Sequence, residues 1–211
     1  MNRLITYAFL IITPLFILAC GDDDSGDKFP SFQTEFVEAN TGADKRIHSI
    51  TTDNGQAYIL TNSIMTDVAD TTFRCVCNFG LQDNETRATV YDIKHIYSFP
   101  PIPASLFKSL DRDPVKVQSL WHSGKYVNII LGVMTSGNGA HACAFCEDSI
   151  TTSSDGTKTV HISLLHKRPD NDIEAYTQKV YLSIPVSHYA DSCNAISLSI
   201  PTYEGTATYT F

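Results

Sequence analysis

The segment TTFRCVCNFG, residues 71–80, is the clearest strand signal in the sequence, because its side chains alternate in character with a period of two. Its two phenylalanines and two cysteines fall on one face, and Arg74 falls on the other. Upstream, Asp53-Asn54-Gly55 separates two extended runs, and Asn-Gly is a strong hairpin signal since both residues tolerate positive φ. The pattern therefore predicts antiparallel β structure on both sides of this segment.

Five strands are expected before Pro100 and no long helix. This number fits a small five-stranded barrel, which we expect to close as a Greek key of the OB type. The run Phe99-Pro100-Pro101-Ile102-Pro103 ends the block, because prolines cannot donate to a strand ladder. The expected strands are Thr34–Glu38, Arg46–Thr52, Gln56–Asn62, Thr71–Gly80 and a long one from Thr86 to Phe99.

A second block of seven short strands follows, separated by turn signals rich in glycine, serine, asparagine and aspartate. This spacing is typical of an immunoglobulin-like β-sandwich. A single helical turn is expected between Ala104 and Leu110. The predicted fold class is thus all-β, with an OB-like barrel at residues 32–108 and an immunoglobulin-like sandwich at residues 109–211. The expected strands are Val115–Trp121, Tyr126–Met134, His141–Asp148, Lys158–Lys167, Gln178–Val186, Ala195–Ile200 and Gly205–Phe211.

The composition excludes two broad classes of protein. With 43% hydrophobic and 18% charged residues, the chain is neither a disordered tail nor a coiled coil. A net charge of −8 also argues against nucleic acid as a partner, because nucleic-acid binders present a basic face.

The N-terminus resembles a bacterial export signal. Arg3 precedes a mostly apolar segment from Leu4 to Leu18, which is shorter than the roughly 20 residues that a spanning helix needs. The segment ends in Leu18-Ala19-Cys20, so residues 1–19 resemble a lipoprotein signal peptide in which Cys20 is acylated after cleavage. An ordinary secretory signal with a chance cysteine is the alternative. Acyl chains on Cys20 would hold the protein at a membrane, since each buried methylene contributes about 0.8 kcal/mol.

Residues 20–31 are expected to form an acidic tether. Four aspartates lie between Gly21 and Asp27, and their repulsion together with glycine favours an extended, unfolded segment. An acidic run directly after the lipidated cysteine resembles the surface-export signal of Bacteroidetes lipoproteins. This places the domains at the outer membrane, on the cell surface; a plain spacer at the periplasmic leaflet is the alternative.

Taken together, these segments resemble the NigD-like lipoproteins of Bacteroidetes. The resemblance rests on five stretches and extends over essentially the whole chain after the export signal. It implies an OB-type N-terminal domain, a C-terminal β-sandwich and a possible role in bacteriocin immunity, but no catalytic residues. The matching stretches are Cys20–Asp24, Thr72–Cys77 with its arginine, Asp113–Ile129, Leu164–Asp172 with a strand-ending histidine before an acidic loop, and Gly205–Phe211.

No catalytic site and no cofactor are predicted, because the sequence contains no nucleophile elbow, phosphate loop, zinc-protease or dinucleotide motif. The most reactive stretch holds His141, Cys143 and Cys146, to which His161 or His166 can add a fourth ligand. It suggests a metal or redox site. Against this, a strand sends Cys143 and Cys146 to opposite faces, so core or disulfide cysteines are the alternative.

Five cysteines remain besides Cys20, an odd number. Cys193 is a candidate to bridge Cys143 or Cys146. Cys75 and Cys77 share one face of a strand and are poorly placed to bridge each other, so we expect them to fill the barrel interior.

Aromatic and acidic residues supply the remaining candidates. Phe36, Tyr58 and Tyr97 are candidates to line a binding face of the barrel. Trp121, Tyr126 and Phe145 occupy core-like positions. The loop from Asp170 to Glu174 has alternating acids that can recruit calcium, but the EF-hand pattern is missing, so an ordinary acidic loop is the favoured interpretation. The expected function is a non-enzymatic, membrane-anchored module that binds an envelope protein or glycan.

Overall fold

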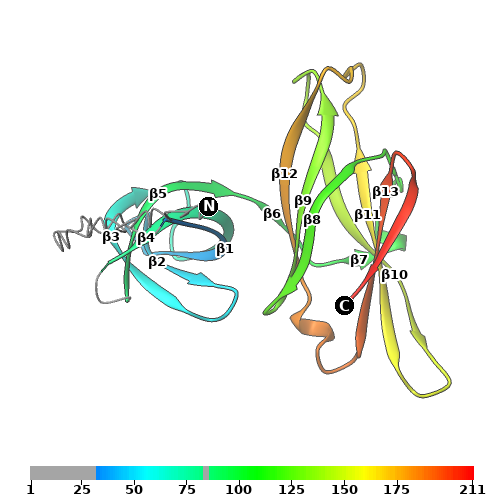
Figure 1. Ribbon diagram of the computed structural model, residues 1–211, viewed down its shortest axis with the longest axis horizontal. Helices are drawn as coiled ribbons and strands as arrows, with labels where there is room; N and C mark the ends of the chain where they lie inside the picture. The colour runs from blue at the N-terminus through cyan, green and yellow to red at the C-terminus, as the bar shows by residue number, and fades with distance from the viewer. Residues whose placement is uncertain (1–31, 83–85) are drawn as a thin grey trace, which may run out of the picture.

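The computed structural model describes residues 32–82 and 86–211. The signal peptide at residues 1–19, Cys20 and the tether at residues 20–31 lie outside the described residues. Figure 1 shows two β domains side by side, a barrel followed by a sandwich. The all-β fold class is therefore confirmed. Within the described ranges, no helix is long and apolar enough to cross a membrane.

The first domain is a closed barrel with strand order β1-β2-β3-β5-β4. The β2–β3 hairpin forms at Asp53-Asn54-Gly55 as expected: Gly55 has φ of +86°, and its N–H donates to the Thr52 carbonyl at 2.9 Å. A parallel pairing of β3 with β5 closes the barrel. Its strands are β1 (Phe32–Thr41), β2 (Arg46–Thr52), β3 (Ala57–Met65), β4 (Thr72–Leu81) and β5 (Arg87–His95).

Alternation along β4 decides what the barrel buries. Cys75, Cys77 and Phe79 are fully buried in the barrel core, as their shared face predicts. Burial raises the pKa of the Cys77 thiol to about 12, and all five described cysteines are free, so these thiols act as small apolar fillers. Arg74 is buried too, with 4% of its surface exposed, but on the opposite face.

The second domain consists of two sheets. One has the order β14-β13-β11-β10-β7 and the other has the order β6-β12-β9-β8. The seven expected strands are present, and β11 and β13 run parallel rather than antiparallel. The strands are β6 (Tyr97–Ser98), β7 (Ile102–Pro103), β8 (Lys116–Ser123), β9 (Tyr126–Thr135), β10 (Ala142–Thr152), β11 (Lys158–Lys167), β12 (Tyr176–Pro185), β13 (Ala195–Thr202) and β14 (Gly205–Thr210).

The long strand expected from Thr86 to Phe99 is interrupted. Pairing of β5 with β4 ends at His95, and the next residue, Ile96, is buried and donates its N–H to the Arg74 carbonyl. The chain then leaves the barrel, because β6 finds its partner in β12 of the sandwich. The expected single turn is present as a 3-10 helix, η1, at Ala104–Leu106, and a second, η2, spans Ser187–Tyr189.

The linker between the domains, residues 96–103, forms its strand pairs with the sandwich and not with the barrel. β6 pairs with β12 on one sheet and β7 pairs with β10 on the other, so the linker crosses from sheet to sheet. The sequence placed the domain boundary between residues 108 and 109, whereas this strand pairing puts the change of domain directly after β5. The sequence did not show that residues 97–103 belong to the sandwich. Their two strands have only two residues each, which is too short for a periodic pattern, and they lie in a proline-rich segment.

Candidate functional site

The contact between barrel and sandwich is built around Arg74. Its Nη2 lies 2.5 Å from Asp53 Oδ1 and donates to Asn128 Oδ1 at 3.1 Å, and its Nε donates to Ser183 Oγ at 3.2 Å. Asn128 Nδ2 in turn donates to Asp53 Oδ2 at 2.6 Å. Strand β4 and the β2–β3 turn thus meet β9 and β12 through one charged, hydrogen-bonded cluster, which we call the Arg74 cluster.

Aromatic rings surround the Arg74 cluster. The guanidinium carbon of Arg74 lies 3.9 Å from the centre of the Tyr126 ring, a cation–π distance, although Nη1 has no hydrogen-bond partner among the described residues. Phe36 packs edge-on against Trp121 with ring centres 5.2 Å apart. A Cβ at Gly124 would lie 2.3 Å from the Asp53 carbonyl oxygen, so the close approach of the two turns requires glycine there.

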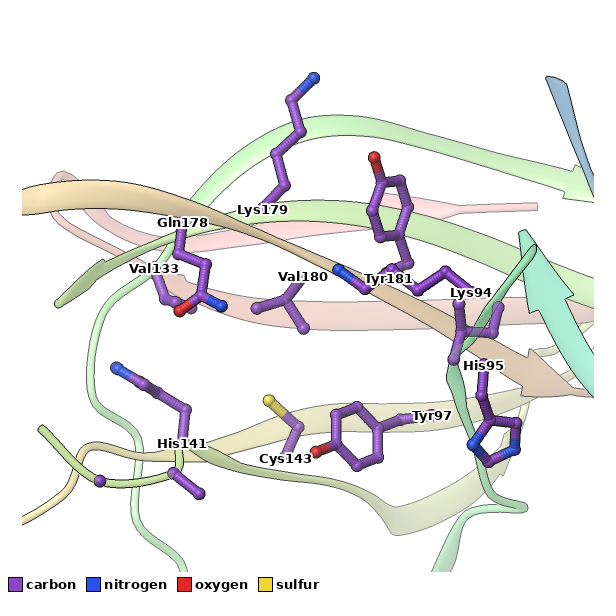
Figure 2. A pocket seen from close by; sticks show the side chains of 13 residues that line it. Lys94, His95, Tyr97, Val133, His141, Cys143, Gln178, Lys179, Val180 and Tyr181 are labelled. Atoms are coloured by element: carbon purple, nitrogen blue, oxygen red, sulfur yellow. The ribbon is translucent and has the colours of Figure 1, made fainter. Parts of the chain in front are cut away.

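Beside this junction lies a cavity of about 420 Å³ between the two sheets, which we call the edge slot. β10 and β12 form its walls, and the end of β5 and β6 close one end. Figure 2 shows Gln178, Val180 and Cys143 facing one another across it, with the Tyr97 hydroxyl pointing toward Cys143. Lys94 and His95 reach the slot from the barrel. None of the described residues that line it is an aspartate or glutamate.

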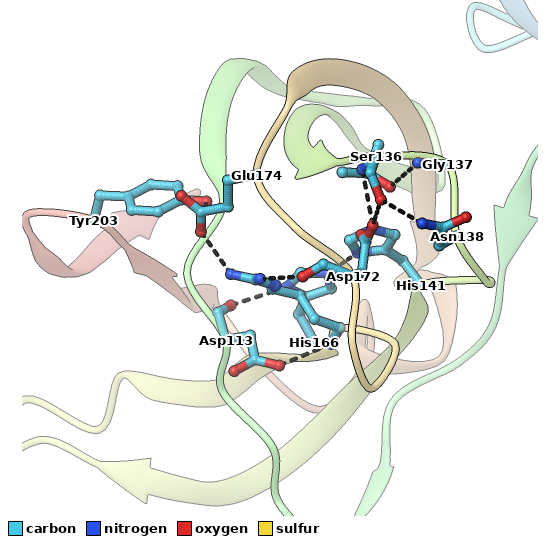
Figure 3. A network of polar contacts seen from close by, with 11 residues as sticks. Asp113, Ser136, Gly137, Asn138, His141, His166, Asp172, Glu174 and Tyr203 are labelled. Carbon is cyan, nitrogen blue, oxygen red and sulfur yellow. Dashed lines mark hydrogen bonds and ion pairs between the residues drawn. The ribbon is translucent and has the colours of Figure 1, made fainter.

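His141 connects the edge slot to a second polar network, shown in Figure 3. Its Nε2 lies 3.2 Å from Asp172 Oδ2, and its Nδ1 lies 2.9 Å from His166 Nε2. Asp172 Oδ1 accepts from the Ser136 backbone N–H at 2.8 Å and from the Ser136 hydroxyl at 2.6 Å. His166 Nδ1 lies 2.9 Å from the Asp113 carbonyl oxygen. All three ionisable side chains are nearly excluded from solvent.

Hydrogen-bond accounting identifies the outer donor nitrogen of each histidine. Asp172 and the Asp113 carbonyl can only accept, so His141 Nε2 and His166 Nδ1 donate to them. Burial lowers the pKa of His166, which favours the neutral form of this ring.

Acid is expected to destabilise the sandwich through Asp172. The hydrogen bonds from Ser136 hold the pKa of Asp172 well below its ordinary value. A carboxylate with a depressed folded-state pKa stabilises the fold above its unfolded pKa, and this stabilisation disappears as the pH falls toward the folded-state value. Asp172→Asn should therefore lower the unfolding midpoint at pH 7 and weaken the loss of stability below about pH 4. Thermal unfolding from pH 7 to pH 2 measures both effects.

The exposed Asp170→Asn provides the matched control, because Asp170 lies on the same loop outside this network. It should leave the unfolding midpoint and its pH dependence unchanged. If Asp172→Asn loses as much stability between pH 7 and pH 2 as the wild-type chain does, the role assigned to Asp172 is contradicted.

The metal-ligand candidates do not converge. Cys143 packs against the sandwich core and faces the edge slot, whereas Cys146 lies on the opposite face of β10 and interacts with Asp148. Among the described residues, no group of three or more histidine, cysteine or acidic side chains is arranged to hold a metal ion. Burial raises the pKa of the Cys143 thiol to about 11, so it is protonated at neutral pH. His161 bonds Thr151 instead.

The candidate disulfide from Cys193 to Cys143 or Cys146 is not formed. Asn194, next to Cys193, accepts from and donates to Lys158 at the start of β11, whereas Cys143 pairs with His166 near its end. Eight residues of strand at about 3.3 Å each separate the two positions. Cys146 pairs with Ser163 and is also several residues away from Lys158 along β11.

The aromatic binding candidates are divided among three environments. Phe36 is buried at the domain junction, Tyr58 is buried in the barrel core against Phe79, and Tyr97 is half exposed on β6 beside the edge slot. They share no barrel face. Of the three core-like aromatics, only Phe145 lies in the sandwich core, since Trp121 and Tyr126 belong to the junction.

The acidic loop after β11 uses its carboxylates within the protein. Asp172 is held by Ser136 and His141, and Glu174 pairs with Arg168 at 2.5 Å. This leaves no converging pair for calcium among these two acids. The strand-ending His166 and the following acidic loop were noticed in the sequence, but not that His141 joins them. Asp53, Asn128 and Ser183 were missed, because each looks like an ordinary turn or strand residue.

These features define a two-domain, all-β protein in which an OB-type barrel is docked on a β-sandwich. Residues 100–211 match the family model for the NigD-like C-terminal beta sandwich domain. The chain therefore belongs to the NigD-like family.

Two solved structures are similar across both domains. A NigD-like immunity protein from Bacteroides caccae is 28% identical, with a TM-score of 0.68, and the match covers 87% of this chain and 93% of that one. A predicted lipoprotein from Bacteroides fragilis is 13% identical, with a TM-score of 0.61 over 86% and 96% of the two chains, which shows the fold alone. No curated protein matches the chain.

Proposed function

We propose that the protein is a lipid-anchored, non-enzymatic binding module of the outer membrane, exposed on the cell surface, that recognises another envelope protein. The observation that carries the binding role is the Arg74 cluster. It fixes the barrel against the sandwich through three polar contacts that cross the junction, and thereby creates a composite surface that neither domain offers alone. A preformed surface reduces the entropy lost on binding.

The chemistry of the edge slot supports binding rather than catalysis. The thiol of Cys143 is protonated, because its pKa is raised, and a protonated thiol is a poor nucleophile. The imidazole of His141 is already engaged by Asp172 and His166. The other polar side chains of the slot are lysine, histidine, glutamine and tyrosine, which recognise polar ligands by hydrogen bonds.

Anchoring is proposed from Cys20. The apolar segment, Ala19-Cys20 and the aspartates behind them support it. A lipid anchor with several acyl chains makes detachment negligible, so the module would remain at the envelope.

Lipidation is tested by metabolic labelling. Cells that express the chain and receive radiolabelled palmitate should yield a labelled protein that partitions with membranes. Cys20→Ala should abolish the label, because the thiol that carries the first acyl group is gone. Cys193→Ala is the matched control, since Cys193 is a free cysteine of the folded sandwich, and should label like wild type. Absence of label from the wild-type chain would contradict the anchor.

Surface exposure is tested on intact cells. Added protease should digest the two domains without lysis if they face outward. Protection until the cells are lysed would place the domains at the periplasmic leaflet instead.

An immunity role is a second candidate. The specific observation in its favour is the similarity to the Bacteroides caccae immunity protein, which extends over both domains at 28% identity. In this case the envelope partner would be a toxin, and cells that lack the protein should be more sensitive to a bacteriocin produced by their own strain. Equal sensitivity with and without the protein would count against it.

A further inference from the structure

The edge slot lies between two sheet edges that are partly unpaired. In the described part of the chain, β12 pairs with β6 only at Leu182 and Ser183, and β10 pairs with β7 only at Cys146 and Glu147. Residues 176–181 of β12 and 142–145 of β10 therefore have no strand partner on the side of the slot. An unpaired edge is a template for another strand.

The backbone of β12 offers hydrogen-bonding groups to the slot. The Val186 N–H donates to the Lys125 carbonyl at 2.9 Å, so even-numbered residues of this ladder direct their backbone toward β9. Alternation then directs the N–H and C=O groups of Lys179 and Tyr181 outward, to the free edge. The backbone groups of Ser183, another odd-numbered residue, also point away from β9, since β6 pairs with β12 at this residue. The free edge thus continues the line of groups that β6 already uses.

The side chains around this edge set the charge of its partner. Lys94 comes from the barrel end with His95 beside it, and Lys179 lies at the rim. No described lining residue is acidic, although the whole chain has a net charge of −8. A basic site in an acidic protein favours a negatively charged ligand.

The base of the slot is apolar. Val133 belongs to the sandwich core, and Val180 and Cys143 pack against that core. A strand that pairs with β12 presents alternate side chains to opposite sides, so one set can meet this apolar base while the other set meets the lysines. The slot therefore fits an extended segment in which apolar and acidic residues alternate.

We propose that the edge slot accepts an extended, acidic segment of the partner protein, which adds to the free edge of β12 as an additional strand. This inference rests on the proposed binding function and names its contact surface and the chemistry of the partner. Backbone hydrogen bonds from Lys179 and Tyr181 supply affinity, and the basic rim together with the apolar base selects the sequence.

The probe is a fluorescein-labelled peptide with the sequence TEVEVT, titrated against the full chain and followed by fluorescence anisotropy. Two matched peptides test its two requirements: TKVKVT reverses the charge, and TEVEVT with N-methylated valines removes two backbone donors. The N-methylated peptide should bind at least ten times more weakly, since each of its two lost backbone hydrogen bonds costs about 1 kcal/mol. TKVKVT should also bind at least ten times more weakly, because its lysines repel those of the slot. Equal binding of all three peptides would overturn the proposal.

Variants of the chain locate the site. Lys179→Pro removes an N–H that points away from β9, toward the free edge of β12. The hydrogen bonds between β12 and β9 therefore remain, while the peptide loses a donor. It should weaken TEVEVT binding about tenfold, and Lys179→Ala, which keeps the N–H, should weaken it about threefold. Equal effects of the two substitutions would contradict strand addition. If Lys179→Pro fails to fold, the N-methylated peptide still decides.

A peptide of the chain's own residues 21–27 provides the last arm. Tighter binding of this peptide than of TEVEVT would assign the slot to the protein's own acidic segment and overturn the partner proposal. Because all titrations are done in solution, their failure leaves the palmitate result unchanged, and failure of lipidation leaves the titrations unchanged.

Discussion

Replacing Arg74 by alanine is expected to lower the free energy of unfolding by about 3–5 kcal/mol and to release the barrel from the sandwich. The side chain of Arg74 is only 2% exposed and that of Asp53 only 9%. Without the guanidinium, Asp53 remains as a buried charge with Asn128 as its remaining polar partner in the junction. The substitution also removes the cation–π contact with Tyr126.

Urea unfolding followed by the fluorescence of Trp121 measures this effect. Trp121 is the chain's single tryptophan and packs on Phe36 at the junction, so its emission should shift to the red when the domains separate. Arg46→Ala is the matched control on the same barrel. Arg46 is nearly half exposed and bonded to Asp44 and Ser63, so its loss should cost at most about 1 kcal/mol. Equal costs for Arg74 and Arg46 would contradict the Arg74 cluster.

A double substitution separates the charge effect from the packing effect. Arg74→Ala combined with Asp53→Ala removes the orphaned charge, so it should destabilise the chain less than Arg74→Ala alone. If the double substitution costs the sum of the two single substitutions, Arg74 and Asp53 have no coupling energy. The aromatic contacts would then have to hold the junction.

Phe79→Ala is expected to lower the stability of the barrel by about 3–5 kcal/mol. Phe79 is fully buried in the barrel core and packs against Tyr58 with ring centres 5.6 Å apart. A small domain tolerates such a cavity poorly, because it has few other buried apolar side chains to stabilise it. Phe32→Ala on the same barrel is the control, since Phe32 is 59% exposed, and it should cost less than about 1.5 kcal/mol. Both are measured by urea unfolding.

The positions of most strands along the chain were predictable from local signals. Alternation along residues 71–80 identified the buried face of β4, and Asp53-Asn54-Gly55 identified the β2–β3 hairpin. The division of residues 86–99 was not predictable. Whether Tyr97 continues β5 or pairs with β12 depends on a partner more than 80 residues away, and that partner leaves no mark on the local pattern.

The polar networks illustrate the same limit. Arg74 and Ser183 are 109 residues apart in the sequence, and Asn128 sits in a strand where a polar residue looks like an exposed one. His141 drew attention through its neighbouring cysteines, but its partners proved to be His166 and Asp172. A strand sends Cys143 and Cys146 to opposite faces, so the spacing that suggested a metal site describes one thiol packed against the sandwich core and another buried on the other face of β10.

Anchoring and rigidity have complementary roles in this account. The proposed lipid at Cys20 holds the protein at the envelope, and the Arg74 cluster keeps the barrel end of the edge slot in place. Lys94 and His95 belong to the barrel, whereas Gln178 and Lys179 belong to the sandwich. A slot assembled from both domains exists only as long as they remain docked.

Residual dipolar couplings of the backbone amides test that central claim most directly. If the barrel and the sandwich form one body, couplings from residues 32–95 and from residues 97–211 should fit a single alignment tensor, and Arg74→Ala should split it into two. Two different tensors in the wild-type chain would show that the domains move independently and that the edge slot is not preformed.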